Sequence, residues 1–239
     1  MTDFPSEPPR NKDQLFSRIR SLIDYGEFRM PGGSRYQGSG AAGMFLEDLL
    51  GLTAGSMDIP DSAGWELKWF SKRTQLITLF HKEANGPEYV MRKMVKHYGW
   101  LDKKGRLSFR HTLEGESDRF RVRADDKLRR LVVRPRTGGG PAPYWSYDEL
   151  IAAAGAKLRR LILVKGEVEK RRVRFLYAEA YETFHLADFI QEVLRGSIAI
   201  DFDCRESKPG SVGLRNHGTK FRISPLAICR LYFKKERIL

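Results

Sequence analysis

Cysteine is scarce in this sequence, and long apolar runs are missing. Its 239 residues include only Cys204 and Cys229, and neither has a histidine at metal-ligand spacing. A disulfide framework or a structural zinc site is therefore not expected, and a reducing cytoplasm is the expected location. No run reaches the roughly 18–20 apolar residues that span a bilayer, so we do not expect a membrane protein. The polar, proline-rich residues 1–13 lack the layout of a secretory signal.

Acidic residues are few relative to basic ones. Lysine and arginine total 43 against 30 aspartates and glutamates, which gives a formal net charge of +13. A surface this basic attracts polyanions, so the charge favours a nucleic-acid partner. Charge alone fits a solubility device or a ribosome-associated protein equally well, and it does not indicate what is done to the nucleic acid.

The order of apolar patterns predicts a mixed α/β fold with substantial antiparallel character. Two strand-like runs, 65–70 and 75–81, are expected to form a hairpin through residues 71–74. The best linker candidate is 136–146, because it holds three glycines and two prolines. Helical spacing marks 13–26, 44–52, 88–97 and 185–196, and further strands are expected at 106–113, 119–124, 172–184 and 197–205.

The segment PDSAGWELK contains the residue types that metal-dependent phosphodiester hydrolysis requires. Asp61 lies in a turn-rich loop, and Glu66 and Lys68 are two residues apart on the next strand. Strand alternation places Glu66 and Lys68 on one face. Magnesium prefers hard oxygen ligands and takes one or two protein carboxylates. We expect Asp61 and Glu66 to bind the metal, and Lys68 to position the water or stabilise the charge that develops on the phosphate.

An acid–x–lysine pair is common, and a solvated strand face is its ordinary explanation. Here the pair lies in an otherwise apolar strand between two tryptophans, where charges are costly unless they are used or paired. Glu47, on the preceding short helix, is a further candidate for the same site. Asp58 is the alternative to Asp61 as the metal ligand, although the Pro60–Asp61 pair favours Asp61.

The runs GSGAAGMFLEDLLGL and PDSAGWELK resemble the active-site region of the MutH and MvaI/BcnI endonucleases, of the PD-(D/E)xK superfamily. The later runs ITLFHKE and RNHGTKFRI are similar to the MvaI/BcnI branch in particular, and the resemblance covers nearly the whole chain. By this resemblance Glu47 matches the helix glutamate, Asp61 the metal-ligand aspartate, Glu66 the second carboxylate and Lys68 the catalytic lysine. The implied cofactor is Mg²⁺, for which Mn²⁺ is a substitute.

The resemblance also implies an architecture and a biological role. It implies a restriction-endonuclease-like fold, in which helices flank a mixed sheet and two lobes clasp double-stranded DNA, with a catalytic lobe near 1–110 and a recognition lobe near 111–239. It further implies a type II enzyme that acts as a monomer by nicking both strands in turn. A cognate DNA methyltransferase is then a genetic rather than a physical partner. The alternatives are a MutH-like mismatch-repair nickase and a sequence-specific DNA-binding protein without catalysis.

Basic residues crowd a glycine-containing turn late in the chain. Arg215, His217, Lys220 and Arg222 place several donors there, and arginine pairs bidentately with guanine. A neutral imidazole has one donor and one acceptor nitrogen and can switch tautomer. Because the family cuts sites of the form CC-N-GG, we predict a CC(C/G)GG-like target whose central pair is read by His217 and His81. Phosphate contacts, and support of the metal site by His81, are the alternative.

Overall fold

Distant segments of the chain come together in each of two structural units. Both units are seen in a computed structural model that describes residues 7–38, 40–52 and 63–239. The units differ from the predicted lobes, which share a single boundary near residue 110, because their segments alternate along the chain. Unit 1 comprises Met1–Ile77, Gly155–His185 and Pro225–Leu239, and unit 2 comprises Thr78–Ala154 and Leu186–Ser224.

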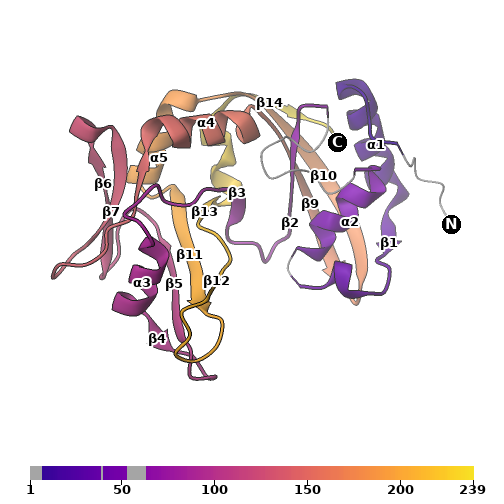
Figure 1. Ribbon diagram of the computed structural model, residues 1–239. Coiled ribbons are helices and arrows are strands. Elements are labelled where there is room, and N and C mark those ends of the chain that lie inside the picture. The colour runs from indigo at the N-terminus through magenta and orange to yellow at the C-terminus, as the bar shows by residue number, and fades with distance from the viewer. Residues whose placement is uncertain (1–6, 39, 53–62) are drawn as a thin grey trace. The chain divides into compact units, whose positions relative to one another are not determined.

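A five-stranded sheet forms the centre of unit 1 (Figure 1). Its strands follow the order β1-β10-β9-β2, and β14 also pairs with β10. The pair β9–β10 is antiparallel, whereas β2 runs parallel to β9. The elements of unit 1 are α1 (Lys12–Tyr25), β1 (Glu27–Arg29), η1 (Ser34–Tyr36), α2 (Ala41–Leu49), β2 (Glu66–Phe70), β9 (Arg160–Glu169), β10 (Arg172–Phe184), η4 (Pro225–Leu231) and β14 (Tyr232–Arg237).

Helices α1 and α2 pack with the apolar face of this sheet. Apolar residues of both helices form one core with the buried residues of β2, β9 and β10. The Phe16 ring meets the Trp65 ring edge-on at a centroid distance of 5.5 Å. Trp65 and Leu67 both lie in this core, which confirms the predicted alternation of β2. The predicted helices at 13–26 and 44–52 are confirmed as α1 and α2.

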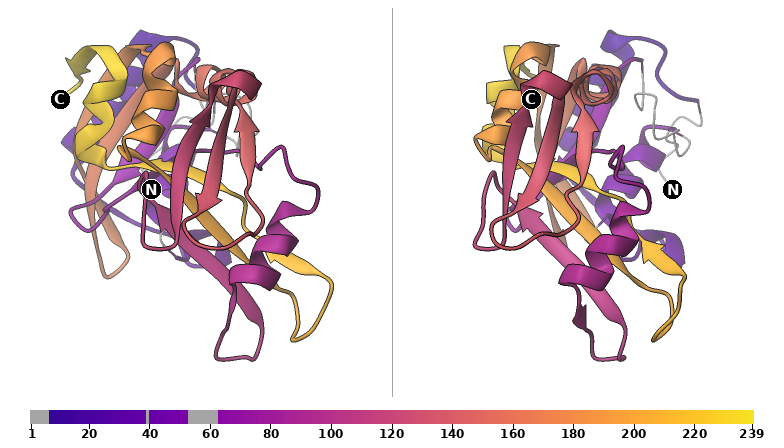
Figure 2. Two further views of the ribbon diagram at one scale, coloured as in Figure 1. Left: turned by 90° about the vertical axis from the view of Figure 1, so that its left-hand side faces the viewer. Right: turned by 60° about the vertical axis from the view of Figure 1, so that its left-hand side comes forward.

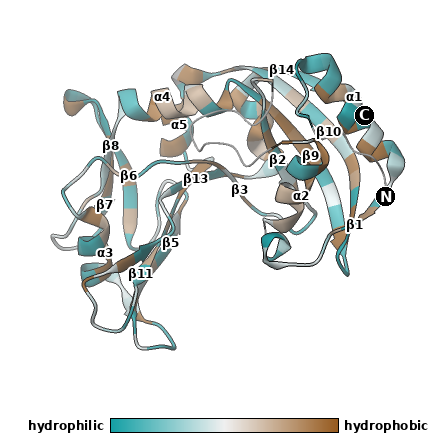
Figure 3. Cartoon of the chain, turned by 45° about the vertical axis from the view of Figure 1, so that its right-hand side comes forward, coloured by the Kyte–Doolittle hydropathy of each residue, from teal (hydrophilic) through white to brown (hydrophobic). Residues whose placement is uncertain are grey.

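Local sequence sets the two ends of α1. The Asn11 side chain accepts a hydrogen bond from the Gln14 amide at 2.9 Å, which satisfies one of the free amides of the first turn. The helix ends at Gly26, whose φ of 93° is readily adopted by glycine alone. Along β10, Figure 3 shows bands of hydrophobic and hydrophilic residues, as expected for a strand with two different faces.

Unit 2 contains a six-stranded and a three-stranded sheet that pack face to face. Their facing residues include Phe109 and Phe120, with ring centroids 5.9 Å apart, and Trp145 and Phe221, 5.7 Å apart. The larger sheet has the order β3-β13-β11-β5-β4 with β12 beside β11, and the smaller has the order β6-β7-β8.

The elements of unit 2 confirm most of the strands expected there. They are α3 (Val90–Tyr98), β4 (Trp100–Leu101), β5 (Leu107–Leu113), β6 (Phe120–Asp125), η2 (Asp126–Leu128), β7 (Arg130–Pro135), β8 (Tyr144–Ser146), η3 (Leu186–Asp188), α5 (Phe189–Leu194), β11 (Ile198–Glu206), β12 (Leu214–Asn216) and β13 (Lys220–Ile223). Strand β3 (Ile77–His81) and helix α4 (Tyr147–Leu158) each include residues of both units.

Three predictions about secondary structure need correction. Strands β2 and β3 do not form a hairpin, because β2 pairs with β9 in unit 1 and β3 pairs with β13 in unit 2. Residues 136–146 are not an inter-domain linker. They connect β7 to β8 within unit 2, where Trp145 is fully buried and donates a hydrogen bond to the Lys82 carbonyl. The helix expected at 185–196 is shorter, consisting of η3 followed by α5.

Within the ranges that the structure describes, no helix is long and apolar enough to cross a membrane.

Trp145 gives a test of the packing in unit 2. Its side chain is fully buried against both sheets, so Trp145→Ala should lower the free energy of unfolding by about 3–5 kcal/mol. Urea unfolding followed by circular dichroism measures this change. The matched control is Trp100→Ala, because Trp100 is 44% exposed and its loss should cost about 1 kcal/mol or less. Equal losses for the two variants would contradict the packing described here.

Candidate active site and nucleic-acid interface

Strand β2 lies at the edge of its sheet, follows a turn and begins with a buried acidic residue. Gly64 has a φ of +76°, a conformation that favours glycine, and it leads the chain into Trp65 and Glu66. The Glu66 side chain is only 3% exposed, and its Oε1 lies 2.5 Å from Nζ of Lys68. Glu66 and Lys68 therefore share one face of β2, as predicted, and they form an ion pair there.

A second lysine reaches the same carboxylate from α4. Nζ of Lys157 lies 3.3 Å from Oε2 of Glu66, and the Lys157 side chain is 10% exposed. The two carboxylate oxygens of Glu66 are thus each held by a different ammonium group. The sequence analysis did not identify Lys157, although a signal was present. Lys157 lies at helical spacing from the buried Leu150 and Ala154, so its position faces the interior of the protein.

Tyr232 adds a buried hydroxyl to these surroundings. Burial, followed by the negative charge of Glu66, raises the pKa of the Tyr232 phenol well above its ordinary value. Among the described residues its hydroxyl has no hydrogen-bond partner. Tyr232 therefore supplies a neutral polar group near Glu66, which sequence patterns did not indicate.

Glu47 and Asp61 complete the set of predicted catalytic residues. Glu47 lies on α2, as expected, and is partly buried. Its neighbour Asp48 accepts hydrogen bonds from the Arg35 guanidinium and the Tyr36 hydroxyl. Burial alone would raise the pKa of Asp48, but these hydrogen bonds hold it below its usual value. Asp61 and its alternative Asp58 lie outside the described residues.

The chemistry of the described donors is compatible with a divalent cation. Glu66 supplies a hard carboxylate in a largely buried position, and magnesium commonly takes only one or two protein carboxylates together with waters. Within the described ranges, no group of three or more His, Cys, Asp or Glu side chains has the arrangement of a metal site. A carboxylate oxygen such as that of Glu66 is the ligand type of magnesium, whereas zinc prefers nitrogen and sulfur ligands.

The predicted base-reading residues gather in unit 2 around the turn between β12 and β13. The Lys82 amide donates to the Thr219 carbonyl, and the Thr219 amide donates to the Glu83 carboxylate at 2.9 Å. These bonds bring the end of β3 against the turn. Gly218 has a φ of +80°, and a Cβ there would lie 3.0 Å from the imidazole of His81. The structure therefore places His81 directly beside the residue that follows His217.

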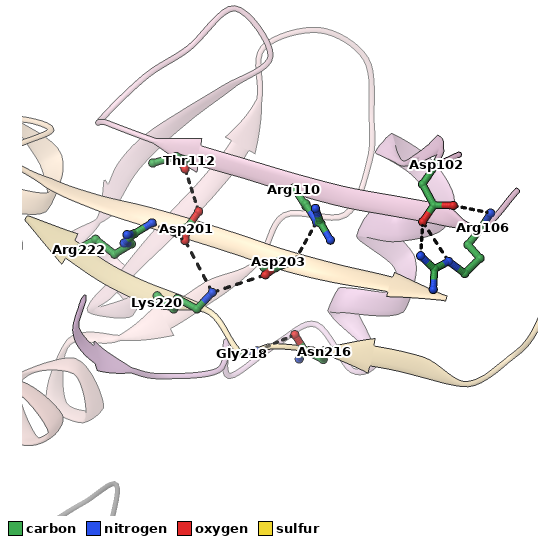
Figure 4. Close-up of polar contacts among 10 residues, drawn as sticks. All are labelled: Asp102, Arg106, Arg110, Thr112, Asp201, Asp203, Asn216, Gly218, Lys220 and Arg222. Atoms are coloured by element: carbon green, nitrogen blue, oxygen red, sulfur yellow. Dashed lines mark hydrogen bonds and ion pairs between the residues drawn. The ribbon is translucent and has the colours of Figure 1, made fainter. Parts of the chain in front are cut away.

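Two of the predicted DNA-binding residues are held by acids on the neighbouring strand (Figure 4). Arg222 pairs with Asp201 at 3.1 Å. Lys220 lies between Asp201 and Asp203, at 3.8 and 3.7 Å. Arg215 and His217, by contrast, are exposed in this part of unit 2. This face of the sheet thus presents oriented donors together with acceptor carboxylates, which is the chemistry needed to contact base edges.

Arg110 extends the same face and was not identified from the sequence. It lies on β5 opposite Asp203, with its Nε 3.0 Å from the carboxylate. Strand alternation predicts that Arg110 and Asp203 share this face only if the pairing of β5 with β11 is already known.

Comparison with known proteins identifies the family of the chain and its fold. The model of the MvaI/BcnI restriction endonuclease family matches residues 25–232. Restriction endonuclease MvaI in complex with its cognate DNA substrate superposes with a TM-score of 0.80 and 21% sequence identity, covering 95% of this chain and 98% of that chain. MvaI in the absence of DNA gives a TM-score of 0.58 and 20% identity, with coverage of 100% and 99%. A search of curated proteins finds no match. The predicted restriction-endonuclease-like α/β fold is confirmed.

The contact between Lys157 and Glu66 gives a test of the site. Replacing Lys157 by methionine removes one of two cations from a buried carboxylate, and should lower the free energy of unfolding by about 3 kcal/mol. The double variant Lys157→Met/Glu66→Gln should lose less free energy of unfolding than the two single variants lose in sum. The difference, the coupling energy, should be at least about 1 kcal/mol. Urea unfolding of all four proteins measures it.

The control uses an exposed ion pair of the same unit. Arg172 lies 2.6 Å from Glu27, and its side chain is 63% exposed. Arg172→Met should cost about 1 kcal/mol or less. A coupling energy near zero between Lys157 and Glu66 would show that their contact contributes nothing to the site.

Proposed function

Because this chain belongs to the MvaI/BcnI restriction endonuclease family, we propose that unit 1 hydrolyses phosphodiester bonds of DNA and that unit 2 reads the base sequence. Membership makes the protein a type II, sequence-specific DNA endonuclease. The observation that carries the assignment of catalysis to unit 1 is the buried Glu66 carboxylate, held by Lys68 on its own strand.

Glu66 and Asp61 are the proposed ligands of a divalent cation, and Mg²⁺ is the proposed ion, with Mn²⁺ as a substitute. When bound, the cation supplies Lewis-acid polarisation of the scissile phosphate. Glu66 suits this role because the two lysines and the surrounding strands fix its carboxylate before the ion arrives. A preorganised ligand of this kind loses little conformational entropy on binding.

Lys68 is the proposed group that acts on the reacting atoms. Its side chain is 23% exposed, so its ammonium is directed by Glu66 yet remains open to a substrate. From there it positions the attacking water and donates a hydrogen bond to the phosphoryl oxygen that gains negative charge. Glu47, on α2, is proposed as a further acid of this site that orients the water. Lys157 acts through Glu66 and is a positioning residue.

If this site catalyses cleavage, substitution of two lysines in the same segment should affect the cleavage rate very differently. Lys68→Met should lower the single-turnover rate of cleavage of unmethylated plasmid DNA by roughly 10²–10³-fold, because a donor to the developing charge is lost. Lys72→Met removes the same charge from an exposed position four residues later and should leave the rate unchanged. Gel-shift binding, measured in parallel, should be retained by both variants.

The aspartate variants complete this experiment. Asp61→Ala should abolish magnesium-dependent cleavage and Asp58→Ala should retain it, and the reverse result would transfer the ligand role to Asp58. Intact DNA with wild-type protein, together with retained binding, would contradict catalysis and favour a DNA-binding protein without enzymatic activity.

For the target we propose a CC(C/G)GG-like site, read by residues around the turn between β12 and β13. Arg215, Lys220 and Arg222 are the proposed contacts to guanines and phosphates. His81 and His217 are the proposed readers of the central pair, and their support is that the His81 ring lies against Gly218, next to His217. An imidazole that can exchange donor and acceptor nitrogens accepts C·G and G·C alike.

Cleavage of four duplexes that differ only at the central pair tests this assignment. The wild type should cut the C·G and G·C duplexes faster than the A·T and T·A duplexes by roughly 5–150-fold, the value of one good base contact. His81→Ala and His217→Ala should each reduce this preference, whereas His97→Ala, on α3 of the same unit, should not. Equal cutting of all four duplexes by the wild type would contradict the assignment.

The biological role that follows is restriction of foreign DNA by a monomer that nicks the two strands in turn. A cognate methyltransferase would protect the host DNA at the same sequence. Support for this role is the family match over residues 25–232.

A further inference from the structure

The three-stranded sheet of unit 2 carries arginines on its outer face. The left-hand view of Figure 2 looks toward this sheet. Its inner face consists of buried residues, among them Phe120 and Val122 of β6, which pack toward the larger sheet. Strand alternation therefore directs Arg121 and Arg123 of β6, and Arg134 of β7, to the opposite side. We call these three residues the arginine face.

The charges of the arginine face are not balanced within the protein. Arg121 and Arg134 are directly opposite each other in the β6–β7 register, an arrangement that is unfavourable for like charges. In the described part of the chain, none of the three forms an ion pair, and Arg134 interacts with Asp125 only through its charge. Such a cluster is stabilised when a polyanion binds to it.

Two acids border these arginines, and both already pair with other arginines. Glu116, which forms a β-bridge with Arg121, pairs with Arg136 at 3.3 Å. Asp125, at the end of β6, pairs with Arg130 at 2.9 Å, and the hydrogen bond from Arg130 lowers the pKa of this carboxyl. The Arg130 guanidinium also lies over the Tyr144 ring, 4.7 Å from its centroid. Arg130 and Asp125 thus neutralise each other and form the border of the arginine face.

The residue types on this face suit phosphate better than a base edge or an apolar partner. Its cations are all arginines, whose planar guanidinium donates two hydrogen bonds to a phosphate. Between them Val132 of β7 is only 4% exposed, although it lies on the outer side of the sheet opposite Arg123. Val132 therefore adds little to the accessible surface, whereas Arg123 and Arg134 are exposed.

The arginine face and the proposed reading face point in opposite directions. Lys220 and Arg222 lie on the outer side of the larger sheet, because Phe221 between them packs inward against Trp145. The arginine face lies on the outer side of the smaller sheet, beyond the same core. Duplex DNA is stiff over about 150 base pairs, so one short duplex cannot follow both faces.

We propose that the arginine face binds the phosphate backbone of a second duplex segment, without reading its sequence, while the reading face holds the target site. This inference rests on the proposed function in taking DNA as the substrate and the turn between β12 and β13 as part of the reading face. It assigns unit 2 two DNA contacts with different roles, one specific and one electrostatic. A second contact of this kind keeps the enzyme close to DNA while it moves between segments.

Salt dependence of binding tests the electrostatic contact. A fluorescent 20-base-pair duplex without a CC-N-GG sequence is titrated with protein from about 50 to 200 mM salt in metal-free buffer. The variant Arg123→Gln/Arg134→Gln should reduce the slope of log K against log salt by about 1.8, because each lost phosphate contact contributes about 0.9. The matched control is Lys103→Gln/Lys104→Gln, which removes two exposed charges elsewhere in unit 2 and should leave the slope unchanged.

A bridging assay tests whether the contact is made with a second segment. Wild-type protein bound to an immobilised CC(C/G)GG duplex should capture the fluorescent duplex, and the arginine variant should lose this capture while it remains bound to the immobilised DNA. An unchanged salt slope in the arginine variant overturns the proposal, and so does failure of the wild type to capture a second duplex. Polyglutamate serves as a probe for acidic proteins. If the arginine variant lost binding to polyglutamate but bound the duplex as the wild type does, the partner of the arginine face would be an acidic protein, and the proposal would be overturned.

Plasmid cleavage separates this inference from the proposed function. If the arginine variant shows the smaller slope but the wild type cuts no DNA, the nuclease function fails and the second DNA contact stands. If the wild type cuts at discrete sites and the slope is unchanged, the second contact alone fails. Circular dichroism melting of both double variants shows that they remain folded.

Discussion

The Glu66 carboxylate, almost fully buried and held by Lys68 and Lys157, is the interaction on which the organisation of unit 1 depends. A buried carboxylate loses its hydration, and it persists only when other charges or hydrogen bonds replace the lost water. Lys68 meets this need from the same strand, whereas Lys157 comes from α4, so the parallel pairing of β2 with β9 must bring the end of α4 close. The geometry of the proposed catalytic site and the packing of unit 1 therefore depend on the same contacts.

Unit 2 differs from unit 1 in that it gathers cations on the outer faces of its two sheets. On the larger sheet, Asp201 and Asp203 of β11 hold Lys220 and Arg222 in defined directions, which a base-reading surface requires. On the smaller sheet, Arg121, Arg123 and Arg134 form no ion pair in the described part of the chain, because the bordering acids Asp125 and Glu116 pair with other arginines. One sheet thus presents cations oriented by carboxylates, and the other presents uncompensated charge. That difference is the physical basis for assigning sequence readout to the first and phosphate binding to the second.

Local patterns predicted what depends on local geometry, and they did not predict strand pairing. Alternation along β2 was enough to place Glu66 and Lys68 together, and the turn at 216–219 was visible from its residue types. The expected hairpin of β2 and β3 was wrong, because β2 pairs with β9 in unit 1 and β3 pairs with β13 in unit 2. The local sequence does not indicate which strand each of them pairs with. Arg110 and the arginine face depend on long-range pairing for the same reason. The helical spacing of Lys157 was visible in the sequence, but its partner Glu66 was not. Asp61 and Asp58 lie outside the described residues, so the choice between them stays a prediction.

The central claim is that this chain cuts DNA at a defined sequence through the site on β2. The most direct measurement is digestion of unmethylated phage DNA in magnesium, followed by sequencing of every fragment end. Cleavage at a defined sequence should give discrete fragments whose ends all fall within one short GC-rich sequence of the CC(C/G)GG type. Ends scattered over unrelated sequences, or DNA that remains intact while the protein stays bound to it, would contradict the account.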